Sequence, residues 1–288
     1  MEFNEYQELA KGTDQRKNNS DELNRLIPLL GMIGEMGSVA SEHKKRLRDG
    51  QSYTTFNEKF KKELGDVLWY ISTLAGDMGI TLDDVARANL SWTEERWDDL
   101  NNFLPDKLYD EDFPENEKLP REFTVEFKEG TTGKIGMFID GKPLGNELDD
   151  NAHEADGYRF HDVFHFSYMA TFGWSPVIRK LLGKKRKSKP EIDNVEDGAR
   201  AQIIEEAISA MVYEHAKDHN FYKDITVIDF DILNTIKGMV RNFETKNISS
   251  SLWEKAIIDG YAVYRELKAK NGGKIYLNLK TRTIKFLS

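Results

Sequence analysis

Two acids one helical turn apart are the residues best suited to chemistry in the first part of the chain. Glu63 and Asp66 lie in the run KKELGDVLWYISTLAGDMG at residues 61–79, whose apolar residues recur at the spacing of a buried helix face. Residues three or four apart on a helix are neighbours, so these carboxylates repel each other unless a cation neutralises them. Carboxylate oxygen is the ligand that Mg²⁺ prefers. The spacing therefore indicates a magnesium site, although acids so placed are also common on solvated helix faces.

Further motifs precede and follow this pair. FNEYQELA stands at residues 3–10, GEMG at 34–37, ELGDVLWY at 63–70, and Asn89 follows. Through these motifs, residues 3–97 resemble the MazG-like family of all-α nucleoside triphosphate pyrophosphohydrolases. The resemblance implies paired helices whose E-x-x-E and E-x-x-D motifs hold Mg²⁺, or Mn²⁺ as the alternative ion, against the phosphates of a nucleotide.

The resemblance also assigns metal ligands and catalytic residues by position. Glu35, Glu63 and Asp66 match the first, third and fourth acids, but Ser38 stands where the second acid belongs. A neutral hydroxyl ligates Mg²⁺ poorly, and Glu42, one turn further along, is a candidate to replace it. Three interpretations are open: an enzyme with a relocated ligand, an enzyme with fewer ligands, or a domain that binds nucleotide without hydrolysing it.

Other residues are candidates for contact with the nucleotide. Lys44 and Lys45 lie in the basic end of a helix, where they either interact with the helix dipole and solvent or meet the triphosphate. Trp69 and Tyr70 are candidates for the base pocket. The resemblance implies that Asn89 contacts the nucleotide or the acids. From its position on an otherwise apolar helix, Asn89 is equally consistent with a hydrogen-bonding core residue.

The leading hypothesis is an Mg²⁺-dependent enzyme that converts a ribo- or deoxyribonucleoside triphosphate to its monophosphate and pyrophosphate. The alternative is a nucleotide sensor, disabled at Ser38 and coupled to the rest of the chain. Small bundles often complete their cores by pairing, and the resemblance implies a homodimer or homotetramer. Gly31, Gly34 and Gly37 recur at every third residue, which predicts a close approach of another backbone.

A second group of candidate ligands lies in the later part of the chain. His161 and His165 are four apart in the predicted helix 158–171, and Glu206 belongs to the predicted helix 199–217. Two histidines at this spacing can bind one transition metal, with a carboxylate from a neighbouring helix. They are equally consistent with hydrogen-bonded core residues. If the chemistry is here, the first domain serves as an oligomerisation platform.

Periodicity divides the chain into two domains. Residues 1–103 are predicted to form a helical bundle of the MazG-like type, and the acidic, proline-containing segment 104–121 a linker. Residues 122–288 read as a helical domain with β-hairpins, because 122–127 and 134–139 alternate around a glycine-rich turn. The predicted fold class is mainly α.

Composition restricts the partners and the compartment. A net charge of −9 argues against general affinity for nucleic acid. The exception is the basic run RKLLGKKRKSKP at residues 179–190, which is either a solvated loop or a docking surface for phosphate-rich molecules. The chain has no cysteine, no signal peptide and no apolar run long enough to span a bilayer. We therefore expect a soluble, cytoplasmic protein.

Overall fold

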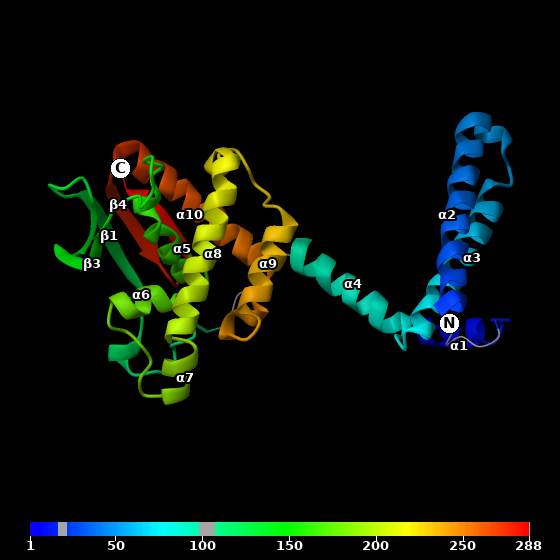
Figure 1. Ribbon diagram of the computed structural model, residues 1–288, viewed down its shortest axis with the longest axis horizontal. Coiled ribbons are helices and arrows are strands. Elements are labelled where there is room, and N and C mark those ends of the chain that lie inside the picture. The colour runs from blue at the N-terminus through cyan, green and yellow to red at the C-terminus, as the bar shows by residue number, and fades with distance from the viewer. Residues whose placement is uncertain (17–21, 98–106, 288) are drawn as a thin grey trace. The chain divides into compact units, whose positions relative to one another are not determined.

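The computed structural model describes residues 1–16, 22–97 and 107–287. The chain divides into two compact units, Met1–Glu94 and Glu95–Ser288 (Figure 1). Both contain helices, and the second also contains a five-stranded sheet. The domain boundary predicted at residue 103 lies outside the described residues. None of the helices in the described ranges is long and apolar enough to cross a membrane.

The first unit is built on a pair of long helices. α2 (Glu22–Asp49) and α3 (Phe56–Asp77) pack along each other, and α1 (Phe3–Lys11) packs on α3. The amide of Gln7 on α1 donates to Ile80 O at 3.0 Å and accepts from the amide of Leu82 at 2.8 Å, which holds the start of α4 (Leu82–Trp97). Among the described residues, α4 makes no extensive contact with α2 or α3. The described part of the first unit therefore does not confirm the predicted bundle arrangement.

The glycines of α2 have two different environments. A Cβ at Gly31 would lie 2.3 Å from the Tyr70 ring, so the predicted close packing is confirmed there, although against a side chain instead of a backbone. At Gly34 and Gly37 it would meet no described atom within 4 Å. The same helix exposes several large apolar side chains, namely Leu26, Ile27, Leu29, Leu30, Ile33 and Met36. None of the described elements buries this face of α2.

The second unit contains a sheet of order β3-β2-β1-β4-β5, in which every neighbouring pair is antiparallel. The predicted hairpin is confirmed as β1 (Glu122–Glu129) and β2 (Ile135–Ile139). Asp140 and Gly141 have φ of 50° and 75°, as a tight turn into β3 requires. The remaining strands are β3 (Lys142–Leu148), β4 (Gly273–Asn278) and β5 (Thr283–Leu287).

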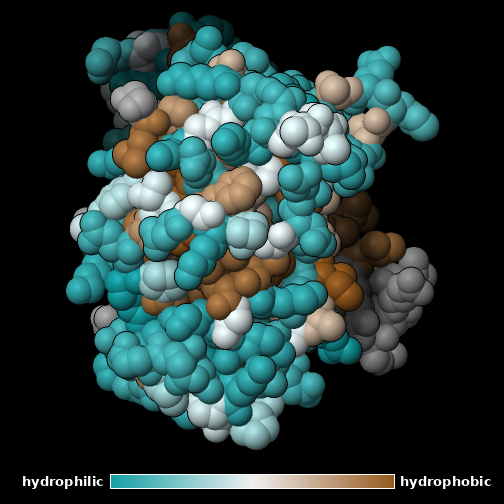
Figure 2. Space-filling model, turned by 90° about the vertical axis from the view of Figure 1, so that its left-hand side faces the viewer, coloured by the Kyte–Doolittle hydropathy of each residue, from teal (hydrophilic) through white to brown (hydrophobic). Residues whose placement is uncertain are grey.

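Helices cover this sheet and carry most of the core. α5 (Asp162–Phe172) and α10 (Ser250–Lys270) pack on each other and on β4 and β5. Every residue of α5 is buried, which explains why its apolar residues lie on all sides of the helix. α8 (Ala199–Asp218) packs against α5 and against two further helices, α6 (Pro176–Leu181) and α9 (Phe230–Val240). Figure 2 shows one face of the molecule, mostly hydrophilic with apolar surface near its middle.

Residues 107–121, in the segment predicted to be a linker, pack into the second unit. Asp110 is fully buried, and its carboxylate pairs with Arg179 at 3.0 Å and with Arg121 at 2.8 Å. The backbone amide of Leu119 donates to the same carboxylate at 2.7 Å. A proline-rich, acidic composition suggests a solvated arm, but here one acid of the segment is the counter-ion of a buried arginine.

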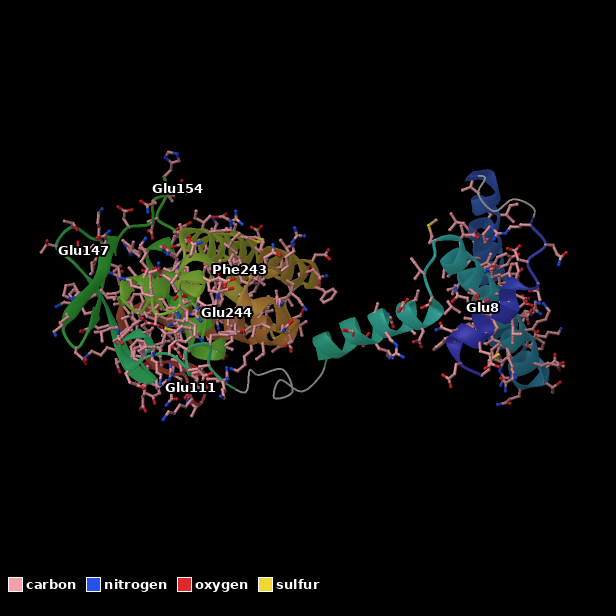
Figure 3. All side chains as sticks on the ribbon, turned by 90° about the horizontal axis from the view of Figure 1, so that it is seen from below. Glu8, Glu111, Glu147, Glu154, Phe243 and Glu244 are labelled. Atoms are coloured by element: carbon pink, nitrogen blue, oxygen red, sulfur yellow. The ribbon has the colours of Figure 1, made fainter. Side chains whose placement is uncertain are left out.

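The basic run 179–190 carries less free charge than its sequence suggests. Arg179 and Arg186 are both 1% exposed, and Arg186 pairs with Asp197 and Glu244, each at 2.7 Å. Figure 3 shows Glu244 among the side chains of the second unit. Lys185 pairs with Asp193, which lies in α7 (Pro190–Val195). Buried arginines are stable only with such partners. Part of this run therefore holds the fold together and is not available to dock a polyanion.

Candidate functional site

The three acids that the sequence singled out lie together in the first unit. Glu35 comes from α2, and Glu63 and Asp66 come from the facing surface of α3. Each offers a carboxylate oxygen, and these oxygens all lie within 4.8 Å of one another. The three residues are half-buried, so the cluster remains open to solvent on one side.

The cluster carries more negative charge than its surroundings neutralise. Partial burial raises the pKa of Glu35, and the neighbouring Asp66 and Glu63 raise it further. The one described cation beside the cluster is Lys62, whose Nζ lies 2.9 Å from Asp66 and 3.6 Å from Glu63. Its side chain is 68% exposed, and ion pairs of exposed lysines are weak. A divalent cation would relieve the remaining repulsion.

Tyr6 is a neighbour of this site that the sequence did not reveal. It lies on α1, and its pKa is raised by partial burial and then by the charge of Asp66. In the sequence, Tyr6 is one of a row of apolar residues on a short amphipathic helix, a pattern that indicates packing but carries no signal of a polar site.

Glu42, the proposed replacement for the missing acid, does not join the cluster. Its carboxylate is nearly buried and accepts hydrogen bonds from Lys45 and from the hydroxyl of Tyr53. These two donors, Lys45 first, lower the pKa of Glu42. Lys45 is thereby engaged, and Lys44 is exposed on the same end of α2. All three lie about two or more helical turns beyond Glu35.

The remaining candidates for nucleotide contact have structural roles or are exposed. Trp69 donates its Nε1 hydrogen to the hydroxyl of Thr13 at 2.7 Å, and its ring meets that of Tyr70 edge-on. Tyr70 in turn fills the space beside Gly31. Asn89 is exposed on α4. None of these three contacts the acids through an interaction found in the described residues.

A cavity of about 490 Å³ lies in the first unit, between α1 and the second half of α3. Polar residues of both helices line it, including Gln7, Lys11, Thr73 and Asp77. Asp77 pairs with Arg16 at 2.8 Å. None of the acids of the Glu35 cluster lines this cavity. The cavity therefore does not indicate a substrate pocket at the cluster.

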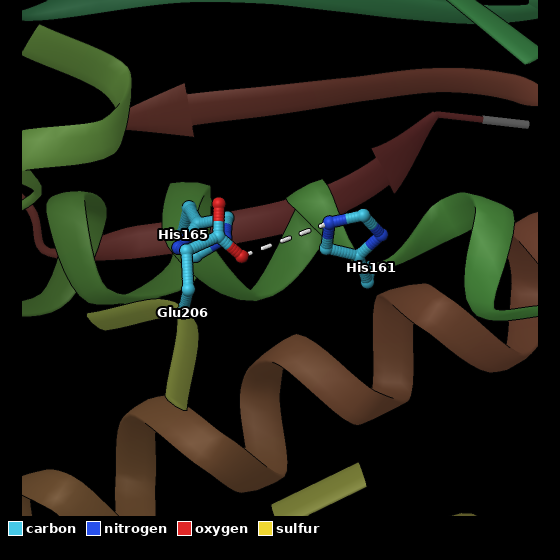
Figure 4. Close-up of side chains that lie close together, drawn as sticks. All are labelled: His161, His165 and Glu206. Atoms are coloured by element: carbon cyan, nitrogen blue, oxygen red, sulfur yellow. Dashed lines mark ion pairs between the residues drawn. The ribbon is translucent and has the colours of Figure 1, made fainter. Parts of the chain in front are cut away.

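The predicted histidine cluster also forms, in the second unit. His161 directly precedes α5, His165 lies in α5, and Glu206 lies in the adjacent α8 (Figure 4). Glu206 Oε2 lies 3.3 Å from His165 Nε2 and 3.9 Å from His161 Nε2. One ligand atom of each residue lies within 4.8 Å of the others. Glu206, the predicted carboxylate from a neighbouring helix, is thus the third member of the cluster.

The other ring nitrogen of each histidine is held by an oxygen atom. His165 Nδ1 lies 2.9 Å from Glu205 Oε1, and His161 Nδ1 lies 2.8 Å from the carbonyl oxygen of Tyr158. A carbonyl can only accept a hydrogen bond, so Nδ1 carries the proton on His161. Glu205 is fully buried and also accepts from the Ser175 hydroxyl at 2.6 Å. Both rings are thus fixed with Nε2 toward Glu206.

The charges of this cluster are strongly coupled. Burial alone would lower the pKa of His165, but Glu205 and Glu206 outweigh it and raise the pKa well above its ordinary value. Burial would raise the pKa of Glu206, but the histidines lower it. The positive charge of His165 and the negative charge of Glu206 therefore stabilise each other.

A cavity of about 540 Å³ opens onto this cluster. Both polar and apolar side chains line it, including His161, Asp162, Lys180 and Glu206. Asp162 Oδ1 lies 3.6 Å from His161 Nε2, which adds a second carboxylate at the edge of the site. The histidine cluster is therefore accessible to a small ligand, although His165 itself is fully buried.

Comparisons with known proteins reveal a family relationship for the later part of the chain. The chain is 37% identical over 71 residues to the "Gene 37 protein" of Mycobacterium phage L5, which covers 24% of this chain and 62% of that protein. The chain thus spans less than two thirds of the length of this relative. No solved structure matches. A sequence model of the MazG C-terminal domain matches residues 105–288, well over half of the chain. The protein therefore belongs to the MazG family, and it does so through the region in which no resemblance was found from its motifs.

Proposed function

We propose that the protein is an Mg²⁺-dependent nucleotide pyrophosphohydrolase that converts a nucleoside triphosphate to its monophosphate and pyrophosphate. The observation that carries the proposal is the convergence of Glu35, Glu63 and Asp66 from two helices within 4.8 Å. Membership of the MazG family supports a pyrophosphohydrolase-like activity.

The donor set fits Mg²⁺. All three side chains offer carboxylate oxygen, the ligand of this hard cation, and the open side of the cluster leaves room for the waters and phosphate oxygens that Mg²⁺ usually keeps. Partial burial raises the pKa of Glu35, and the nearby Asp66 and Glu63 raise it further, so a cation at the cluster would offset both effects. When bound, the ion would neutralise charge on the triphosphate and polarise the phosphorus–oxygen bond to be broken.

The three acids of the cluster have different environments, and these suit them to different roles. Glu63 and Asp66, one turn apart on the same helix, are the pair suited to hold the cation. Glu35, whose pKa is raised, is the carboxylate best suited to take a proton from the attacking water. Lys62 is exposed enough to leave Asp66 and meet a phosphate oxygen.

Ser38 supports the competing proposal of a nucleotide sensor. It occupies the position of the second acid, and Glu42, which could have replaced that acid, is bound instead to Lys45 and Tyr53. A site with three acids holds its cation less tightly than one with four. The sensor proposal predicts nucleotide binding without turnover, and it predicts that Ser38→Glu creates or raises hydrolysis.

The uncovered face of α2 supports self-association as a homodimer or homotetramer. Large apolar side chains with substantial exposure, such as Leu30 at 64% and Ile33 at 58%, follow one another along this helix. Exposed apolar patches of this kind mark interaction sites. A second copy of the same face is the partner that the family resemblance suggests.

Measuring pyrophosphate release from a panel of ribo- and deoxyribonucleoside triphosphates with Mg²⁺ tests the enzyme proposal. We expect release from at least one triphosphate and its loss in Glu63→Gln. Glu58→Gln is the matched control, because Glu58 is exposed near the start of the same helix. No pyrophosphate from any nucleotide would reject the enzyme. Calorimetric binding of a nucleotide in that case would favour the sensor, and its absence would reject both.

A further inference from the structure

We propose that His161, His165 and Glu206 form a binding site for one first-row transition metal ion of the zinc class, with an open coordination position. This site lies in the second unit and is separate from the proposed Mg²⁺ cluster. The donor set distinguishes the two, because two imidazoles and one carboxylate suit zinc or iron, whereas an all-carboxylate set suits magnesium.

The distances between the donor atoms fit one ion. A tetrahedral zinc ion with ligands at about 2.1 Å separates its donors by about 3.4 Å. In the structure, Glu206 Oε2 lies 3.3 Å and 3.9 Å from the Nε2 atoms of His165 and His161. Small side-chain rotations are enough to surround an ion, and the half-exposed Glu206 is free to make them.

The surroundings of the histidines are those of metal ligands. Metal-binding histidines usually donate the hydrogen on their other nitrogen to a carboxylate or carbonyl, which fixes the tautomer. Glu205 fulfils this role for His165, and the carbonyl of Tyr158 fulfils it for His161. Glu205 is itself held by Ser175 Oγ and by the amide of Val177 at 2.8 Å. Two successive layers of side chains therefore position one buried ring.

The second, independent observation is the state of His165 Nε2. His165 is 0% exposed, and its Nε2 makes no hydrogen bond in the structure. Buried polar atoms almost always have such a partner. Glu206 approaches this nitrogen at 3.3 Å without forming a hydrogen bond. An ion between the two residues would satisfy both.

The cavity in front of the cluster is typical of a catalytic metal site and not of a structural one. Structural zinc sites are closed by four protein ligands, whereas catalytic sites have three and leave one position for water or substrate. Here three side chains converge, and the space in front of them is the cavity of about 540 Å³. Lys180 lines this cavity, so a ligand that reaches the ion would meet a positive charge there.

Titration of the full-length protein with Co²⁺, followed by its visible absorption bands, tests the site. The Asp66→Asn variant is used as the background, so that the N-terminal acids do not contribute. We expect one Co²⁺ per chain, displaced by Zn²⁺. Glu206→Gln should weaken binding at least about a hundredfold, and Glu205→Gln about 10- to 100-fold, because Glu205 only orients a ligand.

Two controls keep the result interpretable. Glu214→Gln changes an exposed acid on the same helix and should leave the affinity unchanged. His165→Ala removes a buried ring and could unfold the protein, so circular dichroism checks the folding of each variant. If His165→Ala unfolds, the metal affinity of Glu206→Gln decides the result, because the Glu206 side chain is 45% exposed and its replacement leaves the core intact. No Co²⁺ bands in the background protein, or equal affinity in Glu206→Gln, would overturn the proposal and leave a structural ion pair.

Discussion

The two candidate sites differ in how completely the protein builds them. The acid cluster lies between α2 and α3, is half-exposed, and has a flexible lysine as its nearby cation. The histidine cluster lies on a fully buried helix, and each ring is held from behind by a further polar atom. The acids of the first site are thus held by few contacts, whereas both imidazole rings of the second site are fixed before any ligand arrives.

The two units show the same contrast. Most of the large apolar side chains that are exposed belong to residues 1–94, although these make up only a third of the chain. The second unit has a continuous core of aromatic and aliphatic side chains around α5 and α10. The first unit is thus expected to gain stability from cations, nucleotide and self-association, and the second unit from its own packing and buried ion pairs.

The largest expected effect on stability is in the second unit. Arg186→Met should lower the free energy of unfolding by about 3–5 kcal/mol, because it leaves the buried Asp197 and the partly buried Glu244 without their main partner. Lys187→Met, at the exposed neighbouring position, should change it by less than about 0.5 kcal/mol. Differential scanning calorimetry of both variants measures this, and equal melting curves would contradict the buried network.

A smaller effect is expected from the glycines of α2. Gly31→Ala should cost about 1–3 kcal/mol, because its Cβ would lie 2.3 Å from the Tyr70 ring. Gly34→Ala meets no described atom within 4 Å and should stabilise the helix by up to about 1 kcal/mol. Chemical denaturation followed by circular dichroism compares the two. Similar losses in both would mean that Gly34 is also packed, as in an intermolecular contact.

The self-association proposed for the first unit can be weakened by one charge. Ile33→Asp should raise the dissociation constant of the oligomer by at least about tenfold, or about 1.4 kcal/mol, because Ile33 is 58% exposed on the apolar face of α2. His43→Asp, exposed further along the same helix, is the control. Sedimentation velocity measures both, and a monomeric wild type would reject self-association.

The smallest effect concerns acid stability of the second unit. The pKa of Asp110 is lowered, because its arginine partners outweigh the effect of burial. Its contribution to stability is therefore fully present above about pH 4, the ordinary aspartate pKa, and is lost as the pH falls through the lower folded value. In Asp110→Asn, the melting temperature should fall less steeply below about pH 4 than in wild type. Asp112→Asn, whose side chain is 74% exposed, should keep the wild-type slope.

Local patterns predicted much of the fold. The β1–β2 hairpin and the helices α5 and α8 agree with their predicted ranges within a few residues. Apolar periodicity and turn residues predicted them because both are properties of a short stretch of sequence. The pairing of β4 with β1 was not predicted, since it joins segments far apart in the sequence. The role of residues 107–121 was missed for the same reason, because the burial of Asp110 depends on Arg179.

The sites were predictable to a similar extent. Glu35, Glu63 and Asp66 could be grouped because family motifs connect two helices, and the structure brings them together. Glu42 was proposed from helical spacing alone, which cannot show that Tyr53 and Lys45 occupy its carboxylate. Glu205 and Tyr6 act across helices, so no spacing within one helix indicates them.

The central proposal is that the acid cluster binds Mg²⁺, and thermal melts of wild type and Asp66→Asn, each with and without Mg²⁺, test it most directly. We expect Mg²⁺ to raise the melting temperature of the first unit in wild type but not in the variant. Without Mg²⁺, the variant should be equally or slightly more stable, because one of three mutually repelling charges is removed. No shift in wild type, together with a large loss of stability in Asp66→Asn, would show that Asp66 is a structural charge instead of a metal ligand.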